Sequence, residues 1–270
     1  MSFDEYLSTW IYENIGLNAN PLISNAPYYL GLFPYELYVL PGMFFAIFMM
    51  FATESTIPIQ FHLLPHWFAY SMSIYLKNSV DRERPGCKAK EKGKRIDPKH
   101  CEPEPKMQSF PSGHTVIAFA LFIALFLFLL DPTYNASGEK WIFGDGWPRI
   151  SVLVLAFIVS FNVGLHRVAF GYHHVSDVLI GMVLGCLIGF SSYLMCNKLR
   201  GESWPLGGSS GSSIDWKTYF MYGITQTSSS LSAYPDMVWT GTRLVGCVLS
   251  LVGIWHFFSK SFGKLSELRH

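Results

Sequence analysis

Charged residues are scarce in this chain, which argues against an ordinary water-soluble domain. Only 14% of the 270 residues are Asp, Glu, Lys or Arg, whereas 50% are hydrophobic and 16% are aromatic. A soluble domain usually carries about 25% charged residues. The net charge is only +1, so the chain lacks the basic excess expected of a protein with a nucleic-acid partner. The composition indicates a protein that folds in a membrane.

Other familiar features are missing as well. No internal repeat of about 20 to 50 residues is visible, and no acidic cluster suggests a magnesium site. The N-terminal stretch lacks the basic start and apolar run of a secretory signal peptide. Cysteines number five. Two of them, Cys87 and Cys101, bracket a basic loop, where a disulfide and two free thiols are both open interpretations.

Long apolar runs, by contrast, are abundant. A helix needs about 20 largely apolar residues to cross the hydrocarbon core of a bilayer. The sequence predicts an all-α fold, a multi-pass transmembrane helical bundle of about six spans. The predicted spans are Leu37–Ala52, Ile57–Leu76, Val116–Leu130, Ile150–Leu165, Val178–Cys196 and Val238–Phe258.

We expect one membrane domain over residues 1–270. Within it, residues 1–35 form an N-terminal interfacial segment, and residues 201–236 form a loop rich in Gly and Ser. The apolar residues of segment 1–35 recur at helical spacing, which fits an amphipathic interfacial helix and a helix packed on the bundle equally well. Three glycines, Gly181, Gly185 and Gly189, fall four apart and predict the close approach of another helix.

Polar residues gather at the ends of the predicted spans, in three clusters between residues 77 and 177. The clusters are Lys77 with Arg84-Pro85, then Pro111-Ser112-Gly113-His114, and finally Arg167, His173 and Asp177. If the spans alternate in direction, all three clusters lie at one membrane face. We therefore expect them to form a single catalytic site. The roles of Arg82, His166 and His174 stay open.

The clusters match the chemistry of phosphate binding. Lys77, Arg84 and Arg167 supply three cations, and a phosphate offers up to two negative charges on oxygens that arginine binds bidentately. Such cations would repel one another in low-dielectric surroundings if no anion joined them. Ser112 and Gly113 begin a predicted helix, whose first backbone N–H groups form an anion site. We expect these five residues to bind phosphate.

The imidazoles and the carboxylate of the clusters, from His114, His173 and Asp177, match acid–base and nucleophilic catalysis. His173 and Asp177 are four apart and share a helix face. A carboxylate bonded to one imidazole nitrogen fixes the tautomer and leaves the other nitrogen to attack. A second histidine, His114, would protonate the leaving oxygen. The sequence thus predicts phosphoryl transfer without a metal or cofactor. Each residue alone also fits an interfacial anchor, a turn or a packing contact, but the fixed spacing within all three clusters favours catalysis.

These residues resemble the motifs of the type 2 phosphatidic acid phosphatase superfamily, which also includes glucose-6-phosphatase and the vanadium haloperoxidases. Its pattern, K-x6-R-P, P-S-G-H and S-R-x5-H-x3-D, matches about residues 77–177. One position departs, because His166 stands where a serine is expected. The resemblance implies a helical core bundle, a phosphohistidine intermediate on His173, His114 as the acid, and inhibition by vanadate.

The resemblance also implies a phosphoric monoester hydrolase. A site level with the span ends favours a lipid phosphate or diphosphate whose tail stays in the bilayer. A sugar phosphate substrate, transfer of the phosphoryl group to a lipid or sugar acceptor, and a non-catalytic lipid-binding protein are the alternatives. The sequence leaves the oligomeric state open.

Two signals conflict on the side of the membrane that the site faces. Lys and Arg are denser on the site side, which places it in the cytosol by the positive-inside rule. The resemblance instead implies a lumenal or other extracytoplasmic face. Because phosphate-binding cations inflate the count, we expect the catalytic face to be extracytoplasmic.

Overall fold

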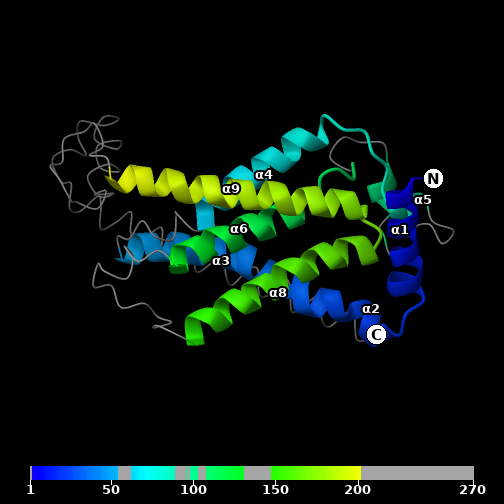
Figure 1. Cartoon of the computed structure of the whole chain (residues 1–270), viewed down its shortest axis with the longest axis horizontal. Helices are drawn as coiled ribbons and strands as arrows, with labels where there is room; N and C mark the ends of the chain where they lie inside the picture. The colour runs from blue at the N-terminus through cyan, green and yellow to red at the C-terminus, as the bar shows by residue number, and fades with distance from the viewer. Residues whose placement is uncertain are drawn as a thin grey trace, which may run out of the picture. The chain divides into compact units, whose positions relative to one another are not determined.

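The computed structural model describes residues 2–53, 62–88, 96, 98–102, 108–130 and 147–201. Every regular element in this part of the chain is a helix, which confirms the predicted all-α class (Figure 1). The chain divides into two compact units: residues 1–36 with 64–193, and residues 37–63 with 194–270. A single domain over residues 1–270 stays a prediction.

The first unit holds most of the described helices. They are α1 (Phe3–Ile11), η1 (Tyr12–Leu17), α2 (Pro21–Pro27), η2 (Tyr28–Leu32), α4 (Leu64–Lys77), α5 (Pro85–Lys88), η4 (Pro98–Cys101), α6 (Gly113–Leu130) and α8 (Trp147–Ala169). The first residues of α3 (Phe33–Thr53) and most of α9 (Val175–Gly201) belong to this unit as well. In the second unit, the ring of His62 lies 4.9 Å from the ring of Tyr38.

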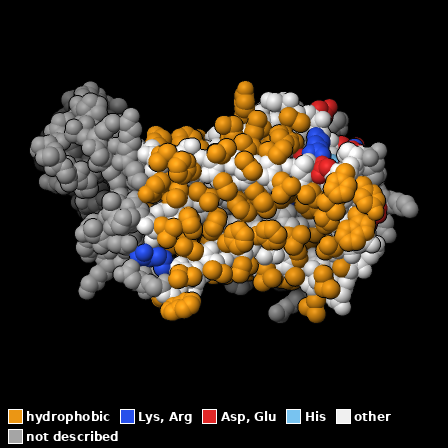
Figure 2. Space-filling view, viewed as in Figure 1, with side chains coloured by type: hydrophobic (Ala, Val, Ile, Leu, Met, Phe, Trp, Pro, Cys, Tyr) orange, Lys and Arg blue, Asp and Glu red, His pale blue; other side chains and the backbone are white. Residues whose placement is uncertain are grey.

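Helix α6 forms the core of the first unit. Its sequence is almost entirely apolar, and it packs against both α4 and α8. Every side chain from Thr115 to Leu121 is buried, which covers all sides of this half of the helix, as expected for an apolar helix enclosed by neighbours. The outward faces of α8 and α9 instead expose hydrophobic side chains, which cover much of the surface in Figure 2. That arrangement suits a bundle surrounded by lipid.

Helix α9 lies directly against α6 along the three predicted glycines. A Cβ atom at Gly185 would lie 2.5 Å from the carbonyl oxygen of Val116, and one at Gly189 would lie 2.5 Å from that of Ala120. At Gly181 the corresponding distance to the carbonyl oxygen of Ser112 is 3.2 Å. The predicted close approach is confirmed, and it brings the start of α9 beside the start of α6, where two of the three polar clusters lie.

Six spans are predicted, and the described residues contain four helical segments that are long and apolar enough to cross a membrane. They are Pro21–Phe48, Gly113–Leu130, Trp147–Ala169 and Val175–Met195. The predicted span 57–76 is described only from residue 62, and its helix α4 has 14 residues. Because residues 57–61 are not among the described residues, the full length of this span stays a prediction. The predicted span 238–258 and residues 202–236 of the predicted loop lie outside the described residues.

The N-terminal helix α1 runs across the ends of α8 and α9 rather than alongside them (Figure 1). Its side chains at Asp4 and Ser8 bond to the start of α9. Its opposite side exposes Phe3, Tyr6 and Trp10, aromatic residues of the kind found where membrane meets water. Helix α1 is thus packed on the bundle and also keeps an outer face with the composition of an interfacial helix, and an interfacial position of segment 1–35 stays a prediction.

Candidate active site

The three predicted clusters come together in the first unit. The guanidinium groups of Arg84 and Arg167 lie over the same aromatic ring, that of Tyr172. The charges of both arginines act on Lys77 and on His173. The expected single cationic site is therefore present, while the catalytic roles of its members stay predictions.

Tyr172 is a member of this site that the sequence motifs did not indicate. Its ring centroid lies 4.0 Å from the guanidinium carbon of Arg167 and 5.7 Å from that of Arg84. The negative face of an aromatic ring attracts such cations. One ring thus keeps two like-charged groups close together. The sequence offers little to single out Tyr172, which is an aromatic residue next to His173 in a chain where aromatic residues are frequent.

Both guanidinium groups are nearly shielded from solvent. Arg84 is 5% exposed and Arg167 is 8% exposed. Burial, together with the charge of Arg167, lowers the pKa of Arg84 to about 10, so Arg84 is still a cation at neutral pH. The Nε atom of Arg167 is buried without a hydrogen-bond partner among the described residues. A buried donor left unpaired costs about 1–3 kcal/mol, which an anion accepting its hydrogen would recover.

Lys77, the last residue of α4, completes the set of cations. Its Nζ donates a 2.6 Å hydrogen bond to the carbonyl oxygen of Gln108. Burial lowers the pKa of Lys77 to about 7, and the charges of Arg84 and Arg167 contribute to this shift. Lys77 therefore sits near its midpoint of titration at neutral pH, and a bound anion would favour its charged form.

His173 has a defined tautomer because of its backbone contact. Its Nδ1 lies 2.5 Å from the carbonyl oxygen of Ser109, an atom that only accepts, so Nδ1 carries the hydrogen. The lone pair then belongs to Nε2. Burial, followed by the charges of Arg167, Arg84 and Lys77, holds the pKa of His173 well below its usual value. The buried imidazole is therefore neutral at physiological pH, as a nucleophile must be.

Asp177 supports His173 in a different way from the one predicted. The closest approach of its Oδ2 to His173 Nδ1 is 4.0 Å, too long for the expected hydrogen bond. That oxygen instead accepts hydrogen bonds from Ser109 Oγ at 2.5 Å and from the backbone N–H of His174 at 2.9 Å. The carboxylate fixes Ser109, and the carbonyl of Ser109 orients the imidazole. A sequence pattern does not reveal this step, because every residue has a carbonyl group.

The start of α6 supplies fewer free donors than predicted. The backbone N–H of Ser112 points to the carbonyl oxygen of Asp177 at 3.3 Å, and its hydroxyl pairs with that of Thr115 at 2.8 Å. The first N–H within the helix to bond back is that of Val116. The backbone N–H groups of Gly113 and His114 precede it and have no intrahelical acceptor. The predicted phosphate contact therefore fits these two groups better than it fits Ser112.

His114 and His166 lie on aromatic surroundings at the edge of the site. The ring of His114 is 5.7 Å from that of Tyr35, and the charges of the three cations act on it. The ring of His166, at the position where the motif has serine, stacks on Phe170 at 4.2 Å and faces Tyr172 at 6.5 Å. The bulkier histidine thus packs beside the ring that carries the arginines.

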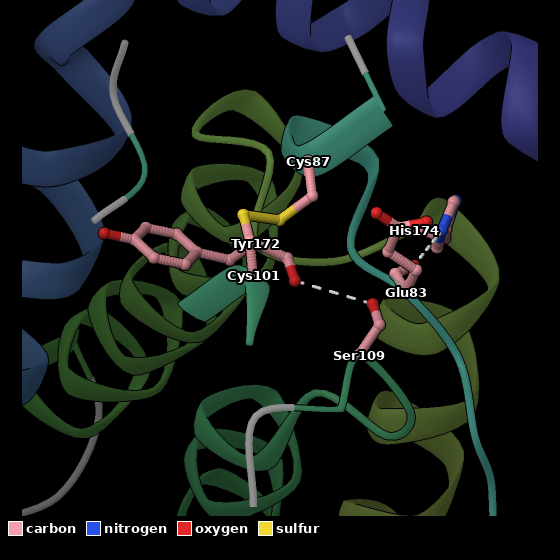
Figure 3. Close-up of a disulfide and its surroundings, with 6 residues drawn as sticks. All are labelled: Glu83, Cys87, Cys101, Ser109, Tyr172 and His174. Atoms are coloured by element: carbon pink, nitrogen blue, oxygen red, sulfur yellow. Dashed lines mark hydrogen bonds between the residues drawn. A yellow bond between two sulfur atoms is a disulfide. The ribbon is translucent and has the colours of Figure 1, made fainter. Parts of the chain in front are cut away.

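Two residues whose roles were open have structural partners. Arg82 binds the carboxylates of Asp4 and Asp177, so its guanidinium is engaged by two side chains of the protein. His174 is buried, with Nε2 3.0 Å from the carbonyl oxygen of Glu83 (Figure 3). Within the described part of the chain, no three His, Cys, Asp or Glu side chains are grouped to hold a metal ion.

A disulfide joins Cys87 to Cys101, which settles the alternative left open by the sequence. It connects α5, directly after Arg84-Pro85, to η4. The neighbouring ring of His100 lies 5.4 Å from that of Tyr172, edge to face. Figure 3 shows the disulfide beside Tyr172, whose carbonyl oxygen accepts a 3.5 Å hydrogen bond from Ser109. The cross-link therefore lies on the same side of the bundle as the site.

Comparisons with known proteins agree with the motifs. A family model described as the PAP2 superfamily matches residues 56–200. The chain is 35% identical over 89 residues to "Probable lipid phosphate phosphatase 4" of Arabidopsis thaliana, an overlap of 32% of this chain and 27% of that protein. It is 34% identical over 82 residues to "Phosphatidylglycerophosphatase B" of Bacillus subtilis (strain 168), an overlap of 30% and 36%.

A solved structure also resembles this chain. It is titled the first transmembrane PAP2 type phosphatidylglycerolphosphate phosphatase from Bacillus subtilis. The TM-score is 0.48 at 22% identity, with 74% of this chain and 89% of that chain covered. The two curated relatives are matched over only 27% and 36% of their own lengths.

If the ring of Tyr172 holds the two arginines together, its removal must weaken anion binding. We expect Tyr172→Leu to weaken the binding of inorganic phosphate roughly tenfold, the scale of a buried cation–π contact. Tyr172→Phe keeps the ring and should stay within about twofold of the unchanged protein. Isothermal titration calorimetry in detergent measures both. Equal weakening by the two substitutions would assign the effect to the hydroxyl and contradict this interpretation.

The lowered pKa of Lys77 predicts a pH dependence of anion binding. A monoester such as phenyl phosphate is already dianionic above about pH 7, so changes at higher pH reflect the protein. As the pH rises through the pKa of Lys77, about 7, the empty site loses a charge that binding must restore. The charged fraction of Lys77 falls from about one half at pH 7 to about one hundredth at pH 9, so we expect affinity to fall by up to roughly 50-fold between these values.

The matched variant for this titration is Lys77→Arg, whose guanidinium stays protonated over the whole range. Its affinity should vary little between those two pH values. A fall of the same size in Lys77→Arg, or a flat profile in the unchanged protein, would show that another group titrates.

Proposed function

This chain belongs to the PAP2 superfamily, and on that premise we propose that it is an integral membrane phosphatase. Its substrate is a lipid phosphate or diphosphate, hydrolysed through a phosphohistidine intermediate. One observation carries the proposal: a buried, neutral His173, with its hydrogen fixed on Nδ1 by the carbonyl of Ser109, lies within the field of three cations. A neutral imidazole with a free Nε2 lone pair is a nucleophile, and the cations suit a phosphate group.

In the first step, Nε2 of His173 attacks phosphorus while the bond from phosphorus to the ester oxygen breaks. His114 gives its proton to that oxygen, so the alcohol leaves uncharged. In the second step His114 takes a proton from water, and the resulting hydroxide displaces the phosphoryl group from Nε2. Inorganic phosphate leaves, and both histidines return to their starting states.

The cations and the start of α6 stabilise the charge that shifts during both steps. Arg84, Arg167 and Lys77 neutralise the three phosphoryl oxygens, and the backbone N–H of Gly113 donates to one of them. A bound dianion would offset the field of these cations at His114, and the proposed reaction requires that His114 then hold the proton that it later donates. The chain's own residues thus supply nucleophile, acid and charge stabilisation.

A lipid substrate is supported by the surroundings of the site. The flanking helices α6, α8 and α9 are long and apolar enough to cross a membrane, and α8 and α9 expose hydrophobic side chains such as Phe161 and Leu179. A lipid can keep its tail beside these helices while its phosphate enters the site. The printed names of the two curated relatives refer to a lipid phosphate and to phosphatidylglycerophosphate. A sugar phosphate is the alternative substrate.

An extracytoplasmic catalytic face is supported by the disulfide. Disulfides persist in oxidising compartments and are rare in the cytosol. The bond between Cys87 and Cys101 lies three residues after Arg84 and next to the aromatic support of the site. The disulfide carries more weight than the positive-inside rule, which favours the cytosol, because three of the Lys and Arg residues counted by that rule belong to the site itself.

The direct test of the proposed reaction is release of phosphate from a set of lipid and sugar phosphates by the purified protein. We expect His173→Ala to lower the rate by at least about 1,000-fold, because the nucleophile is gone. The matched control is His66→Ala, at the opposite end of α4 from Lys77, about 16 Å away along the helix. Unchanged turnover in His173→Ala would refute the nucleophile. Labelled phosphate moving to an added lipid or sugar alcohol rather than to water would favour a phosphotransferase.

Sidedness is tested with sealed vesicles of known orientation. A membrane-impermeant reductant followed by an impermeant maleimide should label Cys87 and Cys101 only when their face is outside, and that face should correspond to the extracytoplasmic side. The double variant Cys87→Ala, Cys101→Ala gives the background from the other cysteines. Labelling of the pair only from the cytoplasmic side would overturn the proposed orientation.

A further inference from the structure

The start of α9, which carries Asp177, is capped by a helix from the far end of the chain. The hydroxyl of Ser8 accepts a 2.9 Å hydrogen bond from the backbone N–H of Val175. The carboxylate of Asp4 accepts from the backbone N–H of Ser176 at 2.9 Å and from its hydroxyl at 2.7 Å. These N–H groups belong to the first turn of α9 and have no acceptor within their own helix. Helix α1 is therefore bound to the element that begins at the site.

The same carboxylate also anchors a cation beside the site. One terminal nitrogen of Arg82 pairs with Asp4. The other donates to Asp177 Oδ1 at 2.5 Å and to the hydroxyl of Ser176 at 2.7 Å. Arg82 thus bridges a carboxylate that is 25% exposed and one that is fully buried. Without Asp4, an arginine that is itself 27% exposed would keep one carboxylate and gain freedom to turn toward water.

Arg82 forms hydrogen bonds with Asp177 and with Ser109, the two residues that orient His173. Its side chain holds Asp177, whose other oxygen accepts from Ser109 Oγ. Its backbone carbonyl accepts a 2.8 Å hydrogen bond from the N–H of Ser109. Ser109 in turn accepts the Nδ1 hydrogen of His173. A continuous set of hydrogen bonds therefore leads from Asp4 through Arg82 to the imidazole.

The titration of Asp4 is consistent with this arrangement. Burial alone would raise the pKa of Asp4, but hydrogen bonds from Ser176 and the charge of Arg82 hold it below its ordinary value. The carboxylate is therefore ionised at neutral pH. It can therefore pair with Arg82 at the pH at which His173 is neutral in the proposed reaction.

We propose that Asp4 is a positioning residue for His173, acting through Arg82, Asp177 and Ser109. The proposal rests on the proposed function for its kinetic consequences, though not for its geometry. Asp4 lies outside residues 56–200, the region matched by the family model. Helix α1 thus contributes to the site from a part of the chain that the catalytic motifs do not include.

The first test is Asp4→Asn, which keeps an oxygen for the N–H of Ser176 but removes the charge that pairs with Arg82. We expect kcat to fall roughly tenfold with KM within about twofold, since misplacing a reacting group slows chemistry rather than binding. Asp4→Glu should recover part of the loss. The matched control is Glu5→Gln on the same turn, whose carboxylate pairs with the exposed Lys88; it should behave like the unchanged protein.

A double variant separates positioning from simple attachment of α1. In an Arg82→Gln background, adding Asp4→Asn should change kcat by less than about twofold, because residues that act as one unit are not additive. A full additional tenfold loss would show that Asp4 acts without Arg82. Turnover of Asp4→Asn equal to that of Glu5→Gln would likewise overturn the proposal while leaving the phosphatase assignment intact.

A spectroscopic measurement tests the geometry even if no ester is hydrolysed. Nitrogen-15 chemical shifts of labelled histidine, assigned with His173→Ala, should show Nδ1 protonated and Nε2 bare in the unchanged protein. In Asp4→Asn we expect a mixture of the two tautomers, and in Glu5→Gln no change. An unaltered His173 signal in Asp4→Asn would refute the positioning role, whatever the activity of the protein.

Discussion

Three cations, Lys77, Arg84 and Arg167, lie together in a region where little water screens their charges. Their mutual repulsion explains most features of the site. At low dielectric such repulsion is several times stronger than in water. The protein offsets part of it with neutral or aromatic groups: the ring of Tyr172 under both arginines and the carbonyl of Gln108 on Lys77. The positive field that remains favours an anion. Burial and then the same field hold the pKa of His173 well below its usual value, so the cations that attract the substrate also help to keep the nucleophile uncharged.

The neutral imidazole of His173 must direct Nε2 toward the substrate, and a hydrogen-bond network through Ser109 and Asp177 determines which nitrogen carries the hydrogen. The carbonyl of Ser109 fixes the hydrogen on Nδ1, and the carboxylate of Asp177 fixes Ser109. The backbone of this region is in turn held by the close packing of α9 on α6 at Gly181 and Gly185. The glycine contacts within the bundle and the hydrogen bonds at its end therefore both fix the distance between the start of α6 and the start of α9.

Much of this site could be predicted because alternating spans bring distant polar clusters to one end of a bundle. The motif residues themselves were found in that way, as was the glycine contact. Three residues of the site could not be predicted from the motifs. Ser109 acts through a backbone carbonyl, which every residue has, and Tyr172 is one of many aromatic residues. Asp4 lies 169 residues before His173 in the chain. The count of six spans stays a prediction, because residues 57–61 of the second predicted span and all of the last one, 238–258, lie outside the described residues.

The proposed reaction depends on a covalent bond between Nε2 of His173 and phosphorus, and chemical trapping can detect that bond. The protein would be mixed with a radiolabelled lipid phosphate, quenched in alkali within milliseconds and digested for mass spectrometry. We expect a phosphoryl group on the peptide containing His173, stable in alkali and lost in acid, as a phosphorus–nitrogen bond to imidazole requires. Label on another residue, or turnover with no covalent label under conditions that trap a known phosphohistidine, would contradict it.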